Sequence, residues 1–533
     1  MESKSANRSQ VTLQALLSQT AVNFPEKTAI IYDNQKFTYK ELEEFSSRFA
    51  CALIDLGVKK GDRVALFLFN SPQFVITYFG ALKAGAVVTT INPLHSEREV
   101  EEQICDSGAQ IIVVTDTLYR VVNKILHKTL LHNVIVTNVN IYSNMVNVKT
   151  DLNVQSLWEL IKKNPSNPML VLQLDPEVDL AVLQYTGGTT GVPKGVMLTH
   201  ANLVSNARAF ASWLNVTSKD VFLSVLPLFH VYGMTASMNT PISSGAEMVL
   251  LSKFDSAKSL QAIAQYQVTI FCGSPTMYAR ILESLEFKKC NLSSVRACIS
   301  GAAPLPTYVQ EQFIQARVFL VEGYGLTEAS PITHCTPIST LFDDIKIGSI
   351  GVPLPGTEAR IVDLETGNRV LLTGEKGELT IRGPQVMRGY WQRTEETLQV
   401  LKDNWLRTGD IAYVDKDGYF YIVDRKKDLI KHNDYSIYPR ELEKILYAHP
   451  DVKLCTIVGK PDQSTGETIK AFIVLKENSK ITNTKKEEIL EFVNSKTATY
   501  KAIKEIEFLQ DLPISSSDKI VKRALNYNQS TDM

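Results

Sequence analysis

The sequence predicts an α/β protein with a large N-terminal domain and a small α+β C-terminal domain. Three observations lead to this prediction: the length of 533 residues, the alternation of apolar strand-like runs with helical stretches before residue 400, and a turn followed by a charged run near residue 424. A chain of this length divides into roughly two to four domains. We therefore expect parallel-sheet βαβ layers in residues 1–424 and a separate domain in residues 425–533.

The N-terminal part begins with two short β-type runs at residues 29–32 and 36–38. Thr38 and Glu41 then supply the two members of a capping box, in which each side chain satisfies a backbone N–H of the first helical turn. This pattern predicts a helix that ends near Gly57.

Beyond this helix, apolar runs alternate with helical stretches. Strands are expected at residues 64–69, 86–90 and 111–115, and a helix at residues 97–105 lies between the last two. This alternation is typical of βαβ units and of a parallel sheet covered on both faces. Residues 128–156 contain several Asn residues and show no clear period, so we interpret them as a surface excursion.

A candidate hinge follows the large domain. A turn over residues 415–418 separates two aromatic β-runs, and the charged segment of residues 424–428 comes next. The elements expected beyond it are a helix at 439–447, strands at 454–458 and 471–475, a helix at 485–493 and a strand at 506–509. They are enough for a domain of about 100 residues.

Composition excludes several classes of function. Lys and Arg total 56 against 57 Asp and Glu, so the net charge of −1 provides no general field to recruit nucleic acid or an anionic membrane. The seven cysteines include no CxxC pair, which favours a reducing compartment over a disulfide framework or a zinc ribbon. Residues 1–10 lack the pattern of a secretory signal and no apolar run is long enough for a transmembrane segment, so we expect a cytoplasmic protein.

The strongest indication of a functional site is the Gly/Thr-rich segment of residues 185–195, which lies between the apolar runs 180–183 and 196–198. Its glycines let backbone N–H groups converge on an anion, its three threonines add hydroxyl donors, and Lys194 contributes a cation. The segment is not a Walker A loop, because it does not end in the Gly-Lys-Ser/Thr sequence that this motif requires. The segment predicts a phosphate-binding loop, and a flexible hairpin tip is the alternative.

The same segment resembles the phosphate loop of the adenylate-forming superfamily, which includes acyl- and aryl-CoA synthetases, luciferases and the adenylation domains of nonribosomal peptide synthetases. Further segments that resemble this superfamily follow in its order, at residues 227–233, 300–305, 323–328, 405–410 and 424–428. The sequence is most similar to the fatty-acyl-CoA synthetase and coumarate-CoA ligase branch. The resemblance implies a β-subdomain within the large domain, and a mobile small domain that rotates about Lys427.

The Tyr-Gly-Leu-Thr-Glu segment combines an aromatic ring, a hydroxyl and a carboxylate suited to a hard cation such as Mg²⁺. The resemblance assigns Tyr324 to adenine, Thr327 to phosphate and Glu328 to the metal. Without the resemblance, the plainer interpretation is that the Tyr324 ring packs in the core and that Glu328 is solvated. Asp410 can accept both ribose hydroxyls, with support from Arg425, although a lone Asp in a turn more often caps a helix.

Four more residues take roles from the resemblance. It places His230 at the mouth of the acyl pocket, where it positions the substrate, although an isolated His is more often a packing residue. Gly301 and Ala302 would let nucleotide and carboxylate approach a backbone turn, and a plain αβ loop is the alternative. Lys519 resembles the C-terminal lysine that reaches into the active site during adenylation, whereas a tail lysine is otherwise a solvated charge.

The complete set of predicted site residues has three parts. The predicted catalytic residues are Lys519, Thr186, Glu328 and His230, and Glu328 is also the predicted metal ligand. The predicted nucleotide- and CoA-binding residues are Thr186, Gly187, Gly188, Thr189, Thr190, Gly191, Lys194, Gly301, Ala302, Tyr324, Gly325, Thr327, Asp410, Arg425 and Lys427.

The predicted function is that of a Mg²⁺-dependent acid:CoA ligase with two half-reactions. ATP and a carboxylic acid, here a medium- or long-chain fatty acid, give an acyl-adenylate and pyrophosphate, and the thiol of coenzyme A then displaces AMP. Mg²⁺ near Glu328, the loop of residues 186–195 and Lys519 would neutralise the negative charge that develops on the phosphates. No nucleic acid partner is expected, and the oligomeric state is left open.

Three alternatives stay open in the sequence: a fatty acyl-AMP ligase that loads a carrier protein, an aryl-CoA ligase, and a nucleotide-binding regulator that has lost the second half-reaction. Asp434 and Asp518 stand where relatives usually have glycine. Asp tolerates left-handed backbone angles, so both loops can keep their shape, but the added charge puts the CoA step in question. Gly187 replaces a common serine and removes one hydroxyl donor.

Overall fold

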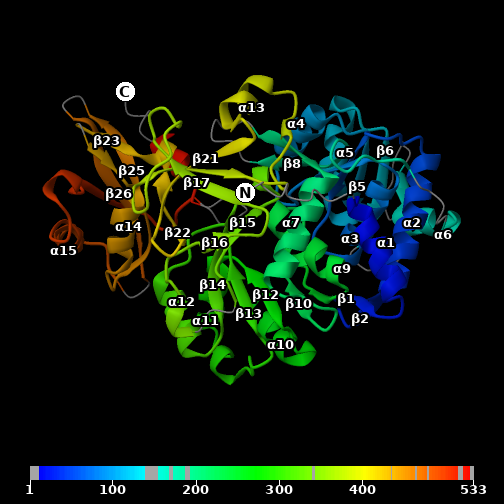
Figure 1. Ribbon diagram of the computed structural model, residues 1–533, viewed down its shortest axis with the longest axis horizontal. Helices are drawn as coiled ribbons and strands as arrows, with labels where there is room; N and C mark the ends of the chain where they lie inside the picture. Colours follow the sequence, from blue (N-terminus) through cyan, green and yellow to red (C-terminus); the bar gives the residue numbers. More distant parts are fainter. Residues whose placement is uncertain are drawn as a thin grey trace, which may run out of the picture. The chain divides into compact units, whose positions relative to one another are not determined.

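The computed structural model describes residues 11–138, 154–166, 172–186, 193–338, 342–433, 435–462, 465–476, 479–513 and 520–527. The chain divides into two compact units (Figure 1). The first comprises Met1–Glu358 and Ile381–Leu406, and the second comprises Ala359–Thr380 and Arg407–Met533. The domain boundary expected between residues 424 and 425 stays a prediction.

The first unit contains a nine-stranded sheet. In sheet order its strands are β16 (Val352–Pro353), β15 (Ile332–Cys335), β14 (Leu320–Gly325), β13 (Ala297–Ser300), β12 (Ile270–Gly273), β10 (Val221–Ser224), β11 (Glu247–Leu250), β1 (Thr28–Tyr32) and β2 (Gln35–Thr38). The strands from β14 to β1 run parallel, whereas β2, β15 and β16 are antiparallel to their neighbours. The carboxyl ends of the parallel strands therefore meet at one edge.

An eight-stranded sheet forms the other β-layer of this unit. In sheet order its strands are β19 (Gly389–Tyr390), β9 (Lys194–Thr199), β8 (Leu180–Thr186), β4 (Val87–Thr90), β3 (Arg63–Phe67), β5 (Ile111–Thr115), β6 (Asn133–Thr137) and β7 (Val154–Ser156). The strands from β8 to β7 are parallel, and β9 is antiparallel to both of its neighbours.

Helices follow most of these strands, as βαβ units require. They are α1 (Leu13–Asn23), α2 (Tyr39–Asp55), α3 (Pro72–Lys83), α4 (Glu97–Ser107), α5 (Tyr119–Ile125), α6 (Leu157–Lys163), α7 (His200–Trp213), α8 (Val231–Met234), α9 (Thr240–Ser244), α10 (Ser256–Tyr266), α11 (Pro275–Glu283), α12 (Thr307–Gln315) and α13 (Thr394–Val400). Shorter turns are η1 (Asp116–Leu118), η2 (Leu126–Lys128), η4 (Phe287–Lys289), η5 (Thr327–Ala329), η6 (Phe342–Asp344) and the π-helical turn η3 (Thr235–Asn239).

The predicted α/β class is confirmed, and local sequence explains why the elements begin where they do. Thr38 and Glu41 form the predicted capping box at the start of α2. All five residues of β5 are buried, as expected for a strand covered on both faces. Separate hydrophobic clusters accompany the two sheets, one around Phe222 and Phe271 and the other around Ile112.

One sequence expectation for this unit is wrong. Residues 128–156 were expected to be a surface excursion, but β6 and β7 both lie within them, and all five residues of β6 are buried. The Val-Ile-Val core of β6 is a β-branched run of the kind that a buried parallel strand requires, and the flanking Asn residues obscure it. Residues 139–153 lie outside the described residues.

The second unit holds two sheets. The first consists of β17 (Glu358–Val362), β18 (Gly377–Arg382), β21 (Trp405–Val414) and β22 (Phe420–Arg425). The short β20 (Leu401–Lys402) and the beginning of β21, with which it pairs, belong to the first unit. The second sheet has the order β24 (Tyr435–Ile437), β23 (Ile430–His432), β26 (Gly466–Leu475) and β25 (Val452–Asp462), with β27 (Glu505–Phe508) also beside β26. Its helical segments are η7 (Lys426–Asp428), α14 (Pro439–Tyr447), α15 (Asn483–Asn494), η8 (Thr499–Lys501) and α16 (Lys522–Tyr527).

The sequence predicted the elements of the second unit well. The turn expected at residues 415–418 joins β21 to β22, and the helix expected at 439–447 is α14. The apolar faces of α14 and α15 contribute Leu442 and Ile489 to one cluster with the buried residues of β25 and β26. This cluster gives the small sheet a hydrophobic core of its own.

Candidate active site

Six of the predicted site residues of the first unit lie at or just beyond the carboxyl ends of two adjacent parallel strands. β13 and β14 pair in register through Ser300 and Glu322. Gly301 and Ala302 come directly after β13, while Tyr324 and Gly325 end β14. Thr327 and Glu328 lie in η5, two residues beyond β14. In open α/β sheets the edge formed by such strand ends is where ligands bind. The structure therefore brings these six predicted residues to one edge of the nine-stranded sheet.

Backbone packing at this edge explains why two of the predicted residues are glycines. A Cβ at Gly325 would lie 2.1 Å from the carbonyl oxygen of Pro331. A Cβ at Gly301 would lie 2.9 Å from the ring of Tyr232, whose hydroxyl donates to the carbonyl of Ile299. Both glycines are thus required by the protein itself, whatever ligand they approach.

The turn after β13 also holds an unusual backbone conformation. Ala302 has a φ of 73°, in the left-handed region that non-glycine residues rarely occupy. Such conformations cost free energy and are concentrated at ligand-binding turns. This observation is consistent with the binding role expected for Ala302.

The carboxylate of Glu328 is held by a residue that no sequence motif indicated. The phenol of Tyr390 donates to Oε1 of Glu328 at 2.8 Å, and the backbone N–H of Met387 donates to the Glu328 carbonyl at the same distance. Burial and the neighbouring Glu328 charge raise the pKa of Tyr390. The phenol is therefore protonated and acts as a donor. Tyr390 comes near Glu328 only because β19 pairs with β9, a contact that the sequence does not reveal.

Tyr324 lies half-buried at the end of β14. Its ring centroid is 5.9 Å from that of His334, at an interplanar angle of 65°. Burial lowers the pKa of His334 to about 3, so this neighbour is neutral. One side of the Tyr324 ring is therefore fixed by a neutral imidazole, which is compatible with a stacking role for the ring.

The predicted phosphate loop connects the antiparallel strands β8 and β9, which pair through Thr186 and Lys194. Residues 187–192 lie outside the described residues, so Gly187, Gly188, Thr189, Thr190 and Gly191 are not placed. Thr186 is half-buried at the end of β8. The phosphate-binding loop therefore stays a prediction, with a hairpin tip as the alternative.

Both strands that flank this loop are tied to the segment around α13. The phenol of Tyr185 donates to Asp106 at 2.5 Å, and Asp106 also lies 3.8 Å from the guanidinium of Arg393. Lys194 forms an ion pair with Glu396 of α13. Sequence reasoning found Lys194 but missed Glu396, because no motif marks that position.

His230 begins α8 as its N-cap residue. Its Nδ1 accepts the backbone N–H of Tyr232 at 3.2 Å, so the neutral ring carries its proton on Nε2. The preceding carbonyl of Phe229 accepts hydrogen bonds from Thr90 at 2.6 Å and from Gln184 at 3.1 Å. These contacts fix the position of His230 at the start of α8.

The remaining predicted residues belong to the second unit. Asp410 and Arg425 face each other on β21 and β22, and the guanidinium Nε lies 2.9 Å from a carboxylate oxygen of Asp410. The Asp410 side chain is buried. Burial lowers the pKa of Lys427 in η7, and the positive charges of Arg425 and Lys522 act in the same direction. Lys519, Asp434 and Asp518 lie outside the described residues.

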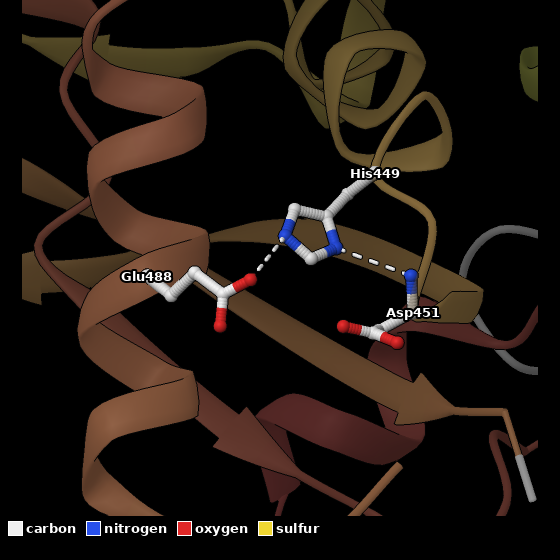
Figure 2. A group of neighbouring side chains, drawn as sticks. All are labelled: His449, Asp451 and Glu488. Carbon is white, nitrogen blue, oxygen red and sulfur yellow. Dashed lines mark hydrogen bonds and ion pairs between the residues drawn. The ribbon is translucent and has the colours of Figure 1, made fainter. Parts of the chain in front are cut away.

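The same unit contains a cluster of three residues of the types that bind metal ions. Figure 2 shows His449, Asp451 and Glu488, whose ligand atoms lie within 4.8 Å of one another. His449 Nδ1 accepts the Asp451 N–H at 3.2 Å, so the neutral ring has its proton on Nε2, which is 3.6 Å from Glu488. The ammonium of Lys485 lies 2.7 Å from Asp451 and 2.6 Å from Glu488. Neither ring nitrogen offers a free lone pair, and a lysine already neutralises the carboxylates, so the group is an internal ion network.

Two cavities lie apart from the predicted residues. One of about 230 Å³ is lined at its polar side by Lys60, Arg63 and Arg388. The other, of about 240 Å³, lies near Tyr32 and Gln73. Neither is lined by a predicted site residue. No helix in the described part of the chain has the length and apolarity needed to cross a bilayer.

Comparison with protein families gives two matches, which together cover most of the chain. The AMP-binding enzyme family matches residues 17–391, and the AMP-binding enzyme C-terminal domain matches residues 441–519.

Individual relatives match over nearly their whole length. The long-chain-fatty-acid–CoA ligase of Bacillus subtilis (strain 168) is 41% identical over 532 residues, which cover 96% of this chain and 94% of that protein. The feruloyl-CoA synthase of an Amycolatopsis species is 35% identical, with 93% of this chain and 95% of that protein covered. Among solved structures, the anthranilate CoA ligase AuaEII in complex with anthranoyl-AMP superposes with a TM-score of 0.87 at 28% identity, over 97% of each chain.

Proposed function

The chain belongs to the AMP-binding enzyme family, and from this premise we propose that it activates a long-chain fatty acid. It is an acid:CoA ligase that works through an acyl-adenylate. The observation that carries the choice of acid is the 41% identity, over almost the full length of both chains, to a long-chain-fatty-acid–CoA ligase. Medium-chain fatty acids, which the sequence analysis also predicted, are compared as alternative substrates in the test below.

The two half-reactions share one activated intermediate. A carboxylate oxygen of the acid attacks the α-phosphorus of ATP, and the bond from that phosphorus to the pyrophosphate oxygen breaks. The sulfur of coenzyme A then attacks the acyl carbon, AMP leaves with the bonding electron pair, and the thiol proton is released. We assign adenine to Tyr324 and phosphate to Thr327, because both lie at the strand-end edge where α/β sheets bind ligands.

His230 is proposed to position the acid. Its Nδ1 accepts the Tyr232 N–H, so in the neutral ring the proton, and with it the donor, is on Nε2. A single donor of this kind orients the carboxylate without removing its nucleophilic lone pair. Asp410 and Arg425 are proposed to bind the ribose, and Lys519 to act on the phosphates during the first step.

Glu328 is proposed to hold Mg²⁺. The residue fits this role, because Tyr390 occupies Oε1 and no described residue donates to Oε2. Carboxylate oxygen is a preferred ligand of Mg²⁺. When bound, the ion supplies positive charge that neutralises the phosphates of ATP.

An aromatic acid is the second candidate substrate. The feruloyl-CoA synthase is 35% identical, and the solved structure of an anthranilate CoA ligase superposes closely, so the same fold accommodates aromatic acids in relatives. The lower identity makes this candidate the weaker one for the present chain. A location in the cytoplasm is proposed with either substrate.

A panel of acids tests the proposal. Purified protein is supplied with ATP and Mg²⁺ and with acetate, octanoate, palmitate, ferulate or anthranilate, and pyrophosphate release is followed with and without coenzyme A. We expect the highest kcat/KM with palmitate and one thioester formed for each pyrophosphate. Preference for ferulate would favour the aromatic candidate. Pyrophosphate release without thioester, but with acyl transfer to an added holo-carrier protein, would instead indicate carrier loading.

A further inference from the structure

The ammonium of Lys194 is not free to meet a phosphate in this structure. It forms an ion pair with a carboxylate oxygen of Glu396 and lies 5.2 Å from the centre of the Tyr390 ring. The Lys194 side chain is only 17% exposed and that of Glu396 is 32% exposed, so solvent screens the pair less than an open surface pair. The cation expected to serve the phosphate loop is therefore neutralised by a neighbouring carboxylate.

Glu396 has a second cation beside it. The guanidinium of Arg393 lies 3.7 Å from the other carboxylate oxygen of Glu396. If Lys194 moved away, Glu396 would keep a positive partner and would not become a buried, unpaired charge. Lysine carries its charge on a flexible stem of four carbons, so its ammonium can change partner without movement of the backbone of β9.

We propose that Glu396 is a positioning residue that holds Lys194 in the nucleotide-free enzyme and competes with the phosphates of ATP for it. The inference rests on the proposed function, because it requires ATP to bind beside the loop that Lys194 follows. On binding, the ammonium exchanges a carboxylate for a phosphate oxygen, and Glu396 retains Arg393. The exchange lowers the affinity for ATP, because the ion pair must break first.

Calorimetric titration of the full-length protein with Mg²⁺-ATP, without acid, tests this exchange. Glu396→Gln is expected to bind ATP roughly 2- to 5-fold more tightly, the range for one partly exposed ion pair. Glu396→Asp keeps the charge and should stay close to wild type. Glu395→Gln, an exposed glutamate one position earlier in α13, is the matched control and should leave the affinity unchanged.

Two further variants separate the inference from simple repulsion and from a structural role. Lys194→Ala should weaken ATP binding roughly 10-fold or more, as loss of a charge-assisted contact does. In the double variant Lys194→Ala/Glu396→Gln, the second change should give no gain, because Glu396 acts only through Lys194. A gain of the same size in both backgrounds would overturn the inference in favour of general repulsion. Weaker ATP binding by Glu396→Gln, with a lower unfolding temperature, would overturn it in favour of a structural brace.

The failure of the inference is distinguishable from failure of the proposed function. If Lys194→Ala weakens ATP binding but Glu396→Gln does not strengthen it, only the competition is wrong. If Lys194→Ala leaves ATP binding unchanged, the proposed role of Lys194 itself is wrong.

Discussion

The phenol of Tyr390 donates a 2.8 Å hydrogen bond to Oε1 of Glu328, from a position 62 residues away in the sequence. The two side chains come from different elements, β19 and η5. Because the pKa of Tyr390 is raised by burial and by the charge of Glu328, the hydroxyl keeps its proton. Tyr390 therefore orients the carboxylate by holding one of its two oxygens. If Glu328 binds Mg²⁺ as proposed, this hydrogen bond fixes the ligand.

Tyr390→Phe removes this hydrogen bond and keeps the ring. We expect the Mg²⁺ concentration for half-maximal pyrophosphate release to rise roughly 10- to 100-fold, the usual effect of losing an outer-shell partner. The measurement is a Mg²⁺ titration of the adenylation step at saturating ATP. A normal Mg²⁺ requirement combined with a lower unfolding temperature would show that Tyr390 serves the fold alone.

Glu328→Gln should raise the Mg²⁺ requirement further, because a neutral amide still coordinates but has lost the charge. Since Tyr390 acts through Glu328, adding Tyr390→Phe to this variant should change the requirement much less than it does in the wild type. The four proteins form a double-mutant cycle with one readout. Fully additive effects would mean that the two residues act independently.

Asp410→Asn tests the proposed ribose site in the second unit. The amide oxygen can still accept one hydrogen bond, but the charge paired with Arg425 is lost. We expect KM for ATP to rise roughly 10-fold with little change in kcat, because ribose binding is the same in ground and transition states. Glu378→Gln is the control, since Glu378 is an equally buried carboxylate paired with Lys426. An equal rise in KM in the control would indicate disturbance of the sheet.

Folding stability should fall in mild acid because of His200. Its Nδ1 accepts the backbone N–H of Leu13 at 3.1 Å, and burial lowers its pKa from 6.5 to about 4. Between these two pH values the unfolded chain binds a proton that the folded protein excludes, so stability present above pH 6.5 is lost as the pH falls toward 4. The loss amounts to roughly 3 kcal/mol at about 1.4 kcal/mol per pKa unit.

His200→Asn keeps a hydrogen-bond acceptor near the position of Nδ1 and cannot titrate. Urea unfolding between pH 7 and pH 4 should show a smaller fall in the free energy of unfolding than in the wild type. Some pH dependence remains in both proteins, because His334 is also buried and neutral. Identical pH profiles would exclude His200 as the source.

Much of the fold was predictable because its signals are local. The capping box of Thr38 and Glu41 fixes the start of α2, and the β-branched run of residues 111–115 is β5. The strand β6 was missed because its short apolar run lies among Asn and other polar residues, which obscure it. Its identity depends on pairing with β5, a long-range contact that no local pattern records.

The site residues also divide into those that local sequence predicts and those that depend on long-range contacts. Gly301, Tyr324 and Glu328 lie at or within a few residues of strand ends, where the order of strands and helices already places ligand-binding residues. Tyr390 and Glu396 could not be found in this way, because they reach the site through the pairing of β19 with β9 and through the side chain of Lys194. Their roles depend on tertiary contacts between segments about 200 residues apart.

Lys519→Ala should separate the two half-reactions. If the lysine acts where charge develops on the phosphates, adenylation should fall roughly 10²- to 10³-fold, the effect of removing one preorganised electrostatic donor. Thioester formation from a supplied acyl-adenylate should change little, because that step forms no pyrophosphate. The measurement is single-turnover kinetics of each half-reaction.

Lys522→Ala is the matched control for Lys519→Ala. The ammonium of Lys522 lies 2.8 Å from Glu443 and donates to the carbonyl of Ile457, so its role within the second unit is structural. Its loss should lower the unfolding temperature and slow both half-reactions by similar factors. Lys519→Ala should instead keep the wild-type unfolding temperature. If it slows both steps equally, as the control does, Lys519 supports the fold and the adenylation step must draw its cation from elsewhere.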